Sequence, residues 1–330
     1  MLNAAVIGLG WWGKTIVRTL ANHDRIRVTA GVDPAPDAAE TAQSLGIVLL
    51  PGLAAVLADR AIHVVILCTP HKLHGRQIAE IAATGRHIFC EKPLCLTRAE
   101  AEHAIAICFA HNVVLGVGHE RRFEPPMLEL RRLVESGALG TLLQIEANFS
   151  QDKFLALPPD NWRLSPVEAP AGPMTATGIH LLDLSISFLG PAERALASCR
   201  TLGTSFANGD TLAAMVEFKS GAHAMISAIL TTPFEGRFAI YGSQGWAEVR
   251  DKTHPEAPEG WTFTTDIRGE GRKSQEFASA SSVKANLDAF ADACLGRNPY
   301  PMPDSQKVET VAALEAIFRS VVSNQIEMVS

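Results

Sequence analysis

Three glycines near the start of the chain have the spacing of a phosphate-binding turn. Gly8, Gly10 and Gly13 follow the apolar run Ala4–Ile7 in the pattern G-x-G-x-x-G. In a strand–turn–helix unit, the first glycine makes the tight turn, the second lets the backbone approach a pyrophosphate, and the third lets the helix pack against the strand. The helix N-terminus then presents N–H groups to the phosphates. The pattern predicts a dinucleotide-binding turn, with a purely structural glycine turn as the alternative.

A carboxylate follows at the place where such a site meets the adenosine ribose. Asp33 ends a second apolar run, Val28–Val32, and can accept hydrogen bonds from both ribose hydroxyls. The next residues, Pro34–Ala35, provide no arginine for a 2′-phosphate. Asp33 therefore favours NAD over NADP, unless it is only a solvated aspartate. Trp11 and Trp12 lie inside the turn and either contact the cofactor or pack beneath the phosphates.

The first part of the chain has the pattern of a parallel sheet with helices on both faces. Continuously apolar segments alternate with alanine-rich segments of helical periodicity, such as Gln77–Ala83 and Ala99–Ala110. Strands that are buried on both faces have such unbroken apolar runs. The predicted strands are Ala4–Ile7, Val28–Val32, His63–Cys68, His87–Cys90 and Val113–Val117.

The second part alternates apolar and polar residues, which is typical of an antiparallel sheet with one covered face. A helical segment, Met127–Glu135, comes first, and we expect the domain boundary near Gly118–Pro126. Two more helices, Val283–Leu295 and Ser305–Ser323, close the chain. The alternating strands are Thr141–Ser150, Thr211–Phe218, Ala222–Thr231 and Arg237–Tyr241.

Composition excludes several classes of protein. A length of 330 residues suggests two domains, and 47% hydrophobic with 19% charged residues is a globular balance. The net charge is −6 with no basic cluster, so we expect no nucleic-acid partner. The N-terminal apolar run is too short for a membrane span and lacks a signal-peptide layout. Six cysteines without a C-x-x-C pair indicate reduced thiols in a cytoplasmic protein.

Further motifs follow the glycine turn in a fixed order, and the ordered set resembles the Gfo/Idh/MocA family, named for glucose-fructose oxidoreductase and inositol dehydrogenase. The likeness runs over the whole chain. The motifs that carry it are Thr69-Pro70 with His74, Glu91-Lys92-Pro93, Arg122-Phe123, Asn161-Trp162-Arg163 and the run Gly178–Asp183.

The resemblance implies an α/β fold with two domains. Residues 1–121 would form a Rossmann domain with a doubly wound parallel sheet. Residues 122–330, with the C-terminal helices 283–323, would form an α/β domain with a large open, mostly antiparallel sheet. Family members oxidise a secondary alcohol of a sugar, cyclitol or related polyol with a nicotinamide cofactor, or reduce the ketone. We expect an NAD-dependent dehydrogenase that forms a homodimer or homotetramer through the C-terminal sheet, whose strands carry residual apolar surface.

Two residues of these motifs line the substrate site in the family, and here they are Lys92 and His180. Histidine suits the base that removes the hydroxyl proton, and a lysine can stabilise the developing alkoxide. A relay in which Lys92 is the proximal acid–base group remains open, as does a core role for His180. The family often has an aspartate where this chain has Ala176, which puts the substrate and the tuning of His180 in question. Asp183 is expected to be structural.

The remaining candidates belong to the cofactor or the substrate side. The expected cofactor contacts beyond the turn are Thr69, Pro70, His71, His74, Glu91 and Lys92. The expected substrate contacts beyond His180 are His119, Arg122, Trp162, Arg163 and Thr177. Alternatives are an ion-pair cluster for Arg122, a surface ion pair for Arg163 and a helix cap for Thr177. His71 and His74 have the spacing of metal ligands, but no ligand cluster accompanies them, so we expect no metal.

The last expectation concerns the backbone at Lys92. We predict that the Lys92–Pro93 peptide is cis, because X–Pro bonds have only a small trans preference and the family usually has this arrangement. Two other functions are alternatives to the dehydrogenase. One is a nucleotide-sensing regulator of the same fold, and the other is an enzyme that recycles bound NAD during glycoside cleavage.

Overall fold

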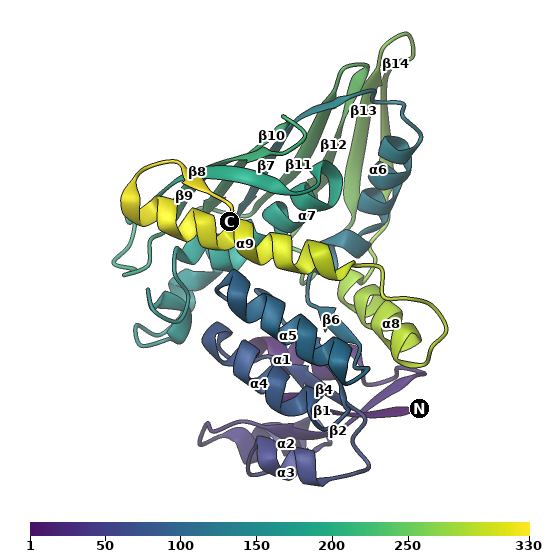
Figure 1. Cartoon of the computed structure of the whole chain (residues 1–330), viewed down its shortest axis with the longest axis vertical. Helices are drawn as coiled ribbons and strands as arrows, with labels where there is room; N and C mark the ends of the chain where they lie inside the picture. The colour runs from purple at the N-terminus through teal and green to yellow at the C-terminus, as the bar shows by residue number, and fades with distance from the viewer. The chain divides into compact units, whose positions relative to one another are not determined.

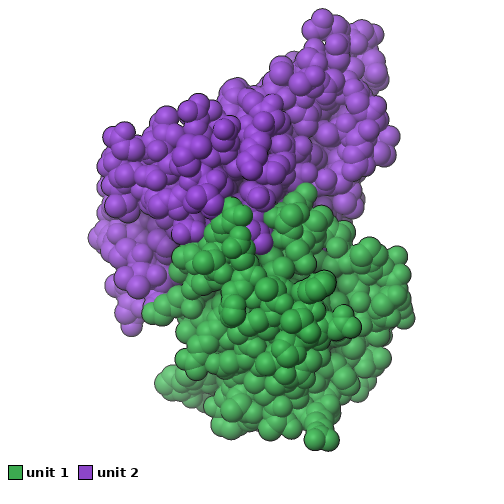
Figure 2. Space-filling model, in the orientation of Figure 1, with its two compact units in different colours: residues 1–120, 283–307 green, residues 121–282, 308–330 purple.

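The computed structural model describes residues 1–330, which form two compact units. Unit 1 holds residues 1–120 and 283–307, and unit 2 holds residues 121–282 and 308–330 (Figure 2). The break at residue 120 is adjacent to the boundary expected from the sequence.

Unit 1 is built on a six-stranded sheet in which all strands run parallel (Figure 1). The strand order is β3-β2-β1-β4-β5-β6. From β1 the chain adds strands first on one side of the sheet and then, from β4, on the other side, so the switch point lies between β1 and β4. Cofactors bind at such a switch point, beyond the carboxyl ends of the strands. The predicted parallel sheet is confirmed, and β3 is an additional strand. The strands are β1 (Leu2–Ile7), β2 (Ile26–Val32), β3 (Val48–Leu49), β4 (Val64–Leu67), β5 (His87–Cys90) and β6 (Leu115–Val117).

The helices of unit 1 connect successive strands. Thr97 caps α5 through a capping box with Glu100, which satisfies two backbone N–H groups of the first turn. The helical elements are α1 (Trp11–Thr19), α2 (Ala38–Ser44), α3 (Leu53–Ala58), the 3₁₀ turn η1 (His71–Leu73), α4 (His74–Ala82) and α5 (Arg98–Ala110).

One C-terminal helix, α8 (Ser282–Cys294), packs with unit 1, which corrects the expectation that both C-terminal helices belong to the second domain. Phe290 is buried in the cluster that includes strand residues of the parallel sheet, and its ring lies 5.4 Å from that of Phe89. Arg25 also pairs with Asp288 and Asp292 of α8. Sequence order suggested the second domain, whereas this apolar face and these charges attach α8 to the first.

Unit 2 is built on a nine-stranded sheet in the order β14-β13-β12-β11-β7-β10-β9-β8-β15. Only β7 and β10 pair in parallel, so the predicted mostly antiparallel sheet is confirmed. The strands are β7 (Leu142–Ser150), β8 (Ala192–Arg200), β9 (Thr211–Phe218), β10 (His223–Ile229), β11 (Glu235–Gly242), β12 (Gly245–Asp251), β13 (Trp261–Ile267), β14 (Gly271–Phe277) and β15 (Glu327–Met328).

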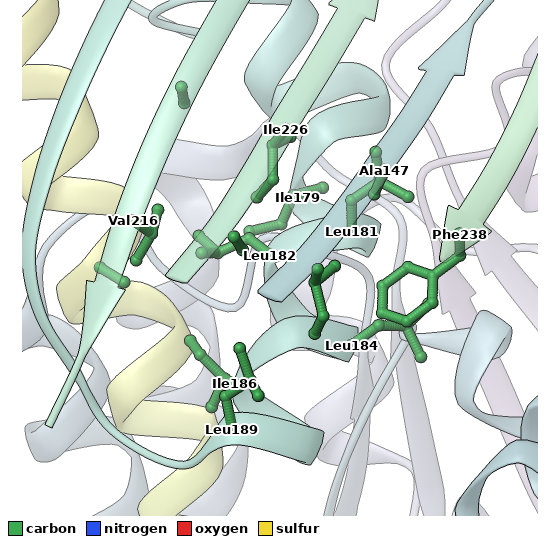
Figure 3. Close-up of a cluster of buried hydrophobic side chains, with 14 of the residues drawn as sticks. Ala147, Ile179, Leu181, Leu182, Leu184, Ile186, Leu189, Val216, Ile226 and Phe238 are labelled. Atoms are coloured by element: carbon green, nitrogen blue, oxygen red, sulfur yellow. The ribbon is translucent and has the colours of Figure 1, made fainter. Parts of the chain in front are cut away.

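Helices cover one face of this sheet and form the larger core. Figure 3 shows Leu181, Leu182 and Ile186 of α7 packed against inward-facing strand residues such as Val216 and Ile226. This burial orients α7 and therefore the residues at its start. The helical elements of unit 2 are η2 (Glu120–Phe123), α6 (Pro125–Glu135), η3 (Lys153–Ala156), η4 (Trp162–Leu164), a π-helical turn (Met174–Gly178), α7 (Ile179–Leu189) and the part of α9 (Asp304–Ser323) that follows residue 307.

The other face of the sheet carries an apolar row. Leu196 of β8 pairs with Met215 of β9, and Met215 pairs with Met225 of β10. Their neighbours along each strand are buried on the helix-covered face, so these three side chains point the opposite way. Leu196 is 39% and Met225 46% exposed. None of the helices has the length and apolar character required to cross a bilayer.

Candidate active site

The glycine turn between β1 and α1 has the backbone geometry that its spacing predicts. Gly8 has φ of +94°, a region that disfavours other residues, and its N–H donates to the carbonyl of Val32 at 2.8 Å. A Cβ on Gly13 would collide with the carbonyl oxygen of Gly8, so the close packing of turn and helix requires glycine. A Cβ on Gly10 would meet open space, which is the room that a pyrophosphate needs. The turn therefore fits the phosphates of a dinucleotide.

Asp33 is tied to this turn by its side chain. The N–H of Leu9 donates to its Oδ2 at 2.6 Å, and the N–H of Ala35 donates to its Oδ1 at 2.8 Å. Both carboxylate oxygens keep lone pairs that can accept ribose hydroxyls. The carboxylate thus orders the turn as well as offering a ribose site, a second role that the sequence did not indicate.

The two tryptophans of the turn lie in different environments. Trp12 is half-buried and packs against the apolar core of unit 1, whereas Trp11 is 40% exposed. Their rings meet edge to face at 6.4 Å. This placement supports packing for Trp12 and leaves cofactor contact as a prediction for Trp11.

The first residue of α4 is a histidine whose two ring nitrogens each lie close to a backbone carbonyl oxygen. His74 is fully buried, with Nδ1 2.8 Å from the carbonyl oxygen of Pro93 and Nε2 3.0 Å from that of Thr69. Burial lowers its pKa, against the opposing effect of these carbonyls. His71 is also buried, with its ring 6.0 Å from that of His74. Direct cofactor contact by a nitrogen of His74 does not fit this geometry.

The predicted cis peptide at Lys92–Pro93 is confirmed. Glu91 continues the sheet ladder, because its N–H donates to the carbonyl of Leu67 at 2.9 Å. Its buried carboxyl group lies against Gly118, where any side chain would collide with it. Burial, followed by the nearby charge of Glu120, raises the pKa of Glu91 to about 8. Lys92, half-buried, thus follows a carboxyl group that is largely neutral at pH 7.

His180 is the second residue of α7 in unit 2. A π-helical turn, Met174–Gly178, precedes it, and such turns often occur at functional sites. The ring is 5% exposed and lies 6.0 Å from that of Phe149. The hydroxyl of Thr177 donates to the carbonyl of Pro173 at 3.3 Å, and that of Thr175 donates to Gly172 at 3.2 Å. Substrate contact by Thr177 would use the remaining lone pairs of its hydroxyl.

Arg122 and Asp183 form a buried bidentate ion pair within unit 2. The Nε of Arg122 lies 2.6 Å from Oδ2 of Asp183, and its Nη2 lies 2.8 Å from Oδ1. The hydroxyl of Thr310 donates to the same carboxylate at 3.3 Å. This arrangement supports the structural roles that the sequence left open for Arg122 and suggested for Asp183. Arg122 as a substrate contact remains only a prediction.

The remaining substrate-side candidates lie in two loops. His119 is buried in unit 1. In unit 2, Trp162 and Arg163 form η4, with the guanidinium 4.3 Å from the indole centroid. Asn208, which lies far from this loop in the sequence, stabilises it, because its Nδ2 donates to the carbonyl of Arg163 at 2.8 Å. No motif signalled Asn208.

No sequence motif marked the cluster of polar side chains around Phe149. The guanidinium of Arg121 lies over the Phe149 ring at 5.2 Å, and the His254 ring lies 5.7 Å from it. Lys153 approaches Nδ1 of His254 at 2.9 Å and pairs with Glu256 at 2.8 Å. Burial, with the charges of Lys153 and Arg121, lowers the pKa of His254 to about 3. His254 lies in a loop without periodicity, so only the fold brings it to the ring that His180 also approaches.

Comparison with known families matches both parts of the chain. Residues 2–119 match the oxidoreductase family with the NAD-binding Rossmann fold, and residues 127–248 match the GFO/IDH/MocA C-terminal domain. The Rhizopine catabolism protein MocA of Rhizobium meliloti is 25% identical over 94% of this chain and 92% of its own.

Other relatives match over shorter segments. The uncharacterized oxidoreductase YrbE of Bacillus subtilis is 30% identical over 61% of this chain. The 2,7-anhydro-N-acetylneuraminate hydratase of Escherichia coli is 26% identical over 68% of it. These matches span 58% and 61% of the two relatives' own lengths.

Solved structures share the whole fold. Levoglucosan dehydrogenase in complex with NADH superposes with a TM-score of 0.87 at 20% identity, covering 100% of this chain and 99% of that one. Aldose-aldose oxidoreductase from Caulobacter crescentus, complexed with glycerol, gives 0.86 at 23% identity, with 99% of both chains covered. Because family models match both its N-terminal and its C-terminal part, the chain belongs to the GFO/IDH/MocA family of oxidoreductases, whose N-terminal domain is an NAD-binding Rossmann fold.

Proposed function

We propose that the protein is an NAD-dependent dehydrogenase that transfers a hydride between nicotinamide and a secondary alcohol or ketone of a sugar, cyclitol or related cyclic diol. The observation that carries the proposal is the glycine turn with Asp33 hydrogen-bonded to it, in a chain of an oxidoreductase family. The names of relatives support the substrate class, since they include sugar dehydrogenases and an inositol 2-dehydrogenase.

The residues of unit 1 would hold the cofactor as follows. The backbone around Gly8, Gly10 and Gly13 receives the pyrophosphate, and Asp33 accepts the ribose hydroxyls. When bound, NAD supplies the hydride acceptor, and the protein supplies orientation and electrostatics. The negative charge of Asp33 disfavours a 2′-phosphate, which supports NAD as the preferred cofactor.

Two side chains carry the proton and the charge of the reaction in this proposal. Oxidation of an alcohol releases a proton from oxygen, and the ring of His180 accepts it because histidine titrates near neutral pH. The ammonium of Lys92 stabilises the alkoxide as its charge develops. Both roles rest on the family resemblance of their motifs.

A redox-neutral reaction is the second candidate. One relative is named a hydratase, and hydration involves no net oxidation. An enzyme of that kind that retained NAD would recycle it within each turnover and accumulate no NADH. The proposed recycling enzyme and the dehydrogenase therefore differ in one measurable product. A regulator would catalyse neither the oxidation nor the redox-neutral reaction.

The test is a screen of purified protein with NAD against sugars, anhydrosugars and cyclitols. Because Ala176 replaces an aspartate frequent in the family, the library extends beyond inositols. Absorbance in the reduced-nicotinamide band should rise with at least one compound, and product analysis detects a redox-neutral reaction. His180→Ala should lose turnover, whereas His103→Ala, a control at an exposed histidine of α5, should keep it. Full turnover in His180→Ala would remove the base assignment.

A further inference from the structure

His74 joins two loops that carry the motifs of unit 1. Thr69 follows β4 and Pro93 follows β5, and these two strands are neighbours in the parallel sheet. The imidazole lies between the two loops, with Nδ1 at the carbonyl oxygen of Pro93 and Nε2 at that of Thr69. The His74 side chain itself is fully buried. One side chain therefore contacts both loops at the carboxyl edge of the sheet.

A hydrogen bond to either carbonyl requires the ring as the donor, and burial lowers the pKa of His74, so the neutral ring donates to one carbonyl at a time. Carbonyl oxygens only accept, so each hydrogen bond needs an N–H from the imidazole. A neutral ring provides one N–H and a protonated ring provides two. A buried carbonyl that loses its donor is costly. Replacement of the ring by an apolar group would thus leave one or both carbonyls unsatisfied and free the loops to separate.

The Pro93 contact acts next to the candidate catalytic lysine. On the N-terminal side of Lys92, the N–H of Glu91 donates to Leu67 and ends the sheet ladder. On the C-terminal side, Pro93 has no N–H, and its carbonyl contacts the ring of His74. The backbone N–H of Lys92 itself donates to Oε2 of Glu91 at 3.3 Å. The lysine is therefore fixed between a ladder bond and the His74 bond.

We propose that His74 is a positioning residue for Lys92, acting through the Pro93 carbonyl. The proposal rests on the proposed function only for the statement that Lys92 contacts the substrate. The histidine of the T-P-x-x-x-H motif then positions the lysine of the E-K-P motif, which links the two motifs of this chain.

Two amide variants test the Pro93 contact and the Thr69 contact separately. The side-chain nitrogen of asparagine occupies nearly the position of Nδ1, and that of glutamine nearly the position of Nε2. His74→Asn therefore keeps a donor for Pro93, whereas His74→Gln keeps a donor for Thr69. His74→Phe leaves no donor for either carbonyl. His103→Asn, at an exposed histidine of α5, is the matched control.

The readout is the chemical reactivity of Lys92 in the full-length protein, without cofactor or substrate. Trace acetic anhydride labels the lysines over a range of pH, and peptide mass spectrometry compares Lys92 with the exposed Lys219. We expect Lys92 in His74→Gln and His74→Phe to react about fivefold faster than in wild type, the factor of one lost hydrogen bond. In His74→Asn and His103→Asn the ratio should equal that of the wild type.

Any other pattern would overturn the proposal. Equal Lys92 reactivity in the asparagine and glutamine variants would show that the Pro93 contact does not position the lysine. Unfolding of both amide variants, seen by circular dichroism, would show that His74 serves the fold as a whole. Because labelling needs no turnover, failure of the dehydrogenase screen would count against the proposed function alone.

Discussion

Replacement of Asp33 should change cofactor affinity and fold stability together. The carboxylate accepts the Leu9 N–H at 2.6 Å and the Ala35 N–H at 2.8 Å, and it is the proposed acceptor of the ribose hydroxyls. Leu9 is 2% exposed, so its amide has no easy access to water once the carboxylate is gone. Asp33→Ala therefore removes an acceptor from a buried donor and a binding group from the cofactor site.

The magnitudes follow from hydrogen bonds to a charged acceptor. Each such bond contributes about 1.5–3 kcal/mol. Loss of the Leu9 bond should lower the free energy of unfolding by about that amount. Loss of the ribose contact should weaken NADH binding by about 10- to 100-fold. NADPH affinity should stay constant or improve, because the charge that opposes a 2′-phosphate is absent.

Fluorescence titration with NADH and NADPH, together with urea unfolding, measures these effects. Asp33→Asn is the control for shape: it keeps one acceptor oxygen but places an amide group against a backbone N–H. Its NADH affinity should lie between wild type and Asp33→Ala. Wild-type protein that binds NADPH as tightly as NADH would refute the reasoning, as would an unchanged NADH affinity in Asp33→Ala.

Four further outcomes are expected. Lys92→Ala should lower turnover by about 100-fold or more with little change in NADH affinity, since its interaction grows with alkoxide charge; steady-state kinetics on a screened substrate measures this. Asp183→Ala should lower the free energy of unfolding by about 3–5 kcal/mol, because it removes the bidentate carboxylate partner of the buried Arg122 guanidinium; a linear denaturant extrapolation would contradict this if it showed no loss. The pKa of Glu91 is about 8 in the folded protein, whereas its ordinary value is 4.5. Between these pH values the folded state binds more protons than the unfolded state, so the free energy of unfolding falls as the pH rises from 4.5 to 8. Glu91→Gln should flatten that fall in pH-dependent unfolding. Met225→Lys should convert the proposed homo-oligomer to monomers by light scattering, because it places a charge in the exposed apolar row of the open sheet face; wild-type monomers would contradict the oligomer itself.

Periodicity predicted the elements whose burial pattern is simple. The fully buried β4 has an unbroken apolar sequence, and β9 alternates over the predicted range Thr211–Phe218. By contrast, β14 is polar on both faces and exposed, so no pattern marked it. The π-helical turn before α7 also has no sequence signal, because no residue pattern distinguishes such a turn from an ordinary helix start.

The candidate site was predictable to the extent that short motifs define backbone geometry. The glycine turn and the cis Lys92–Pro93 peptide follow from local residues and the family pattern. The contacts of His74 with Pro93, and of His254 with Phe149, depend on residues that only the fold brings together. For the same reason Arg122 was expected at the substrate, whereas its partner Asp183 lies on a helix far along the chain.

Isotope transfer tests hydride transfer to the nicotinamide most directly. A substrate from the screen is deuterated at its carbinol carbon and incubated with the protein and NAD, and the reduced cofactor is analysed by mass spectrometry. We predict one deuterium on the nicotinamide ring of the NADH that forms. Oxidised product with unlabelled reduced cofactor, or turnover of NAD-free protein at the full rate, would contradict it.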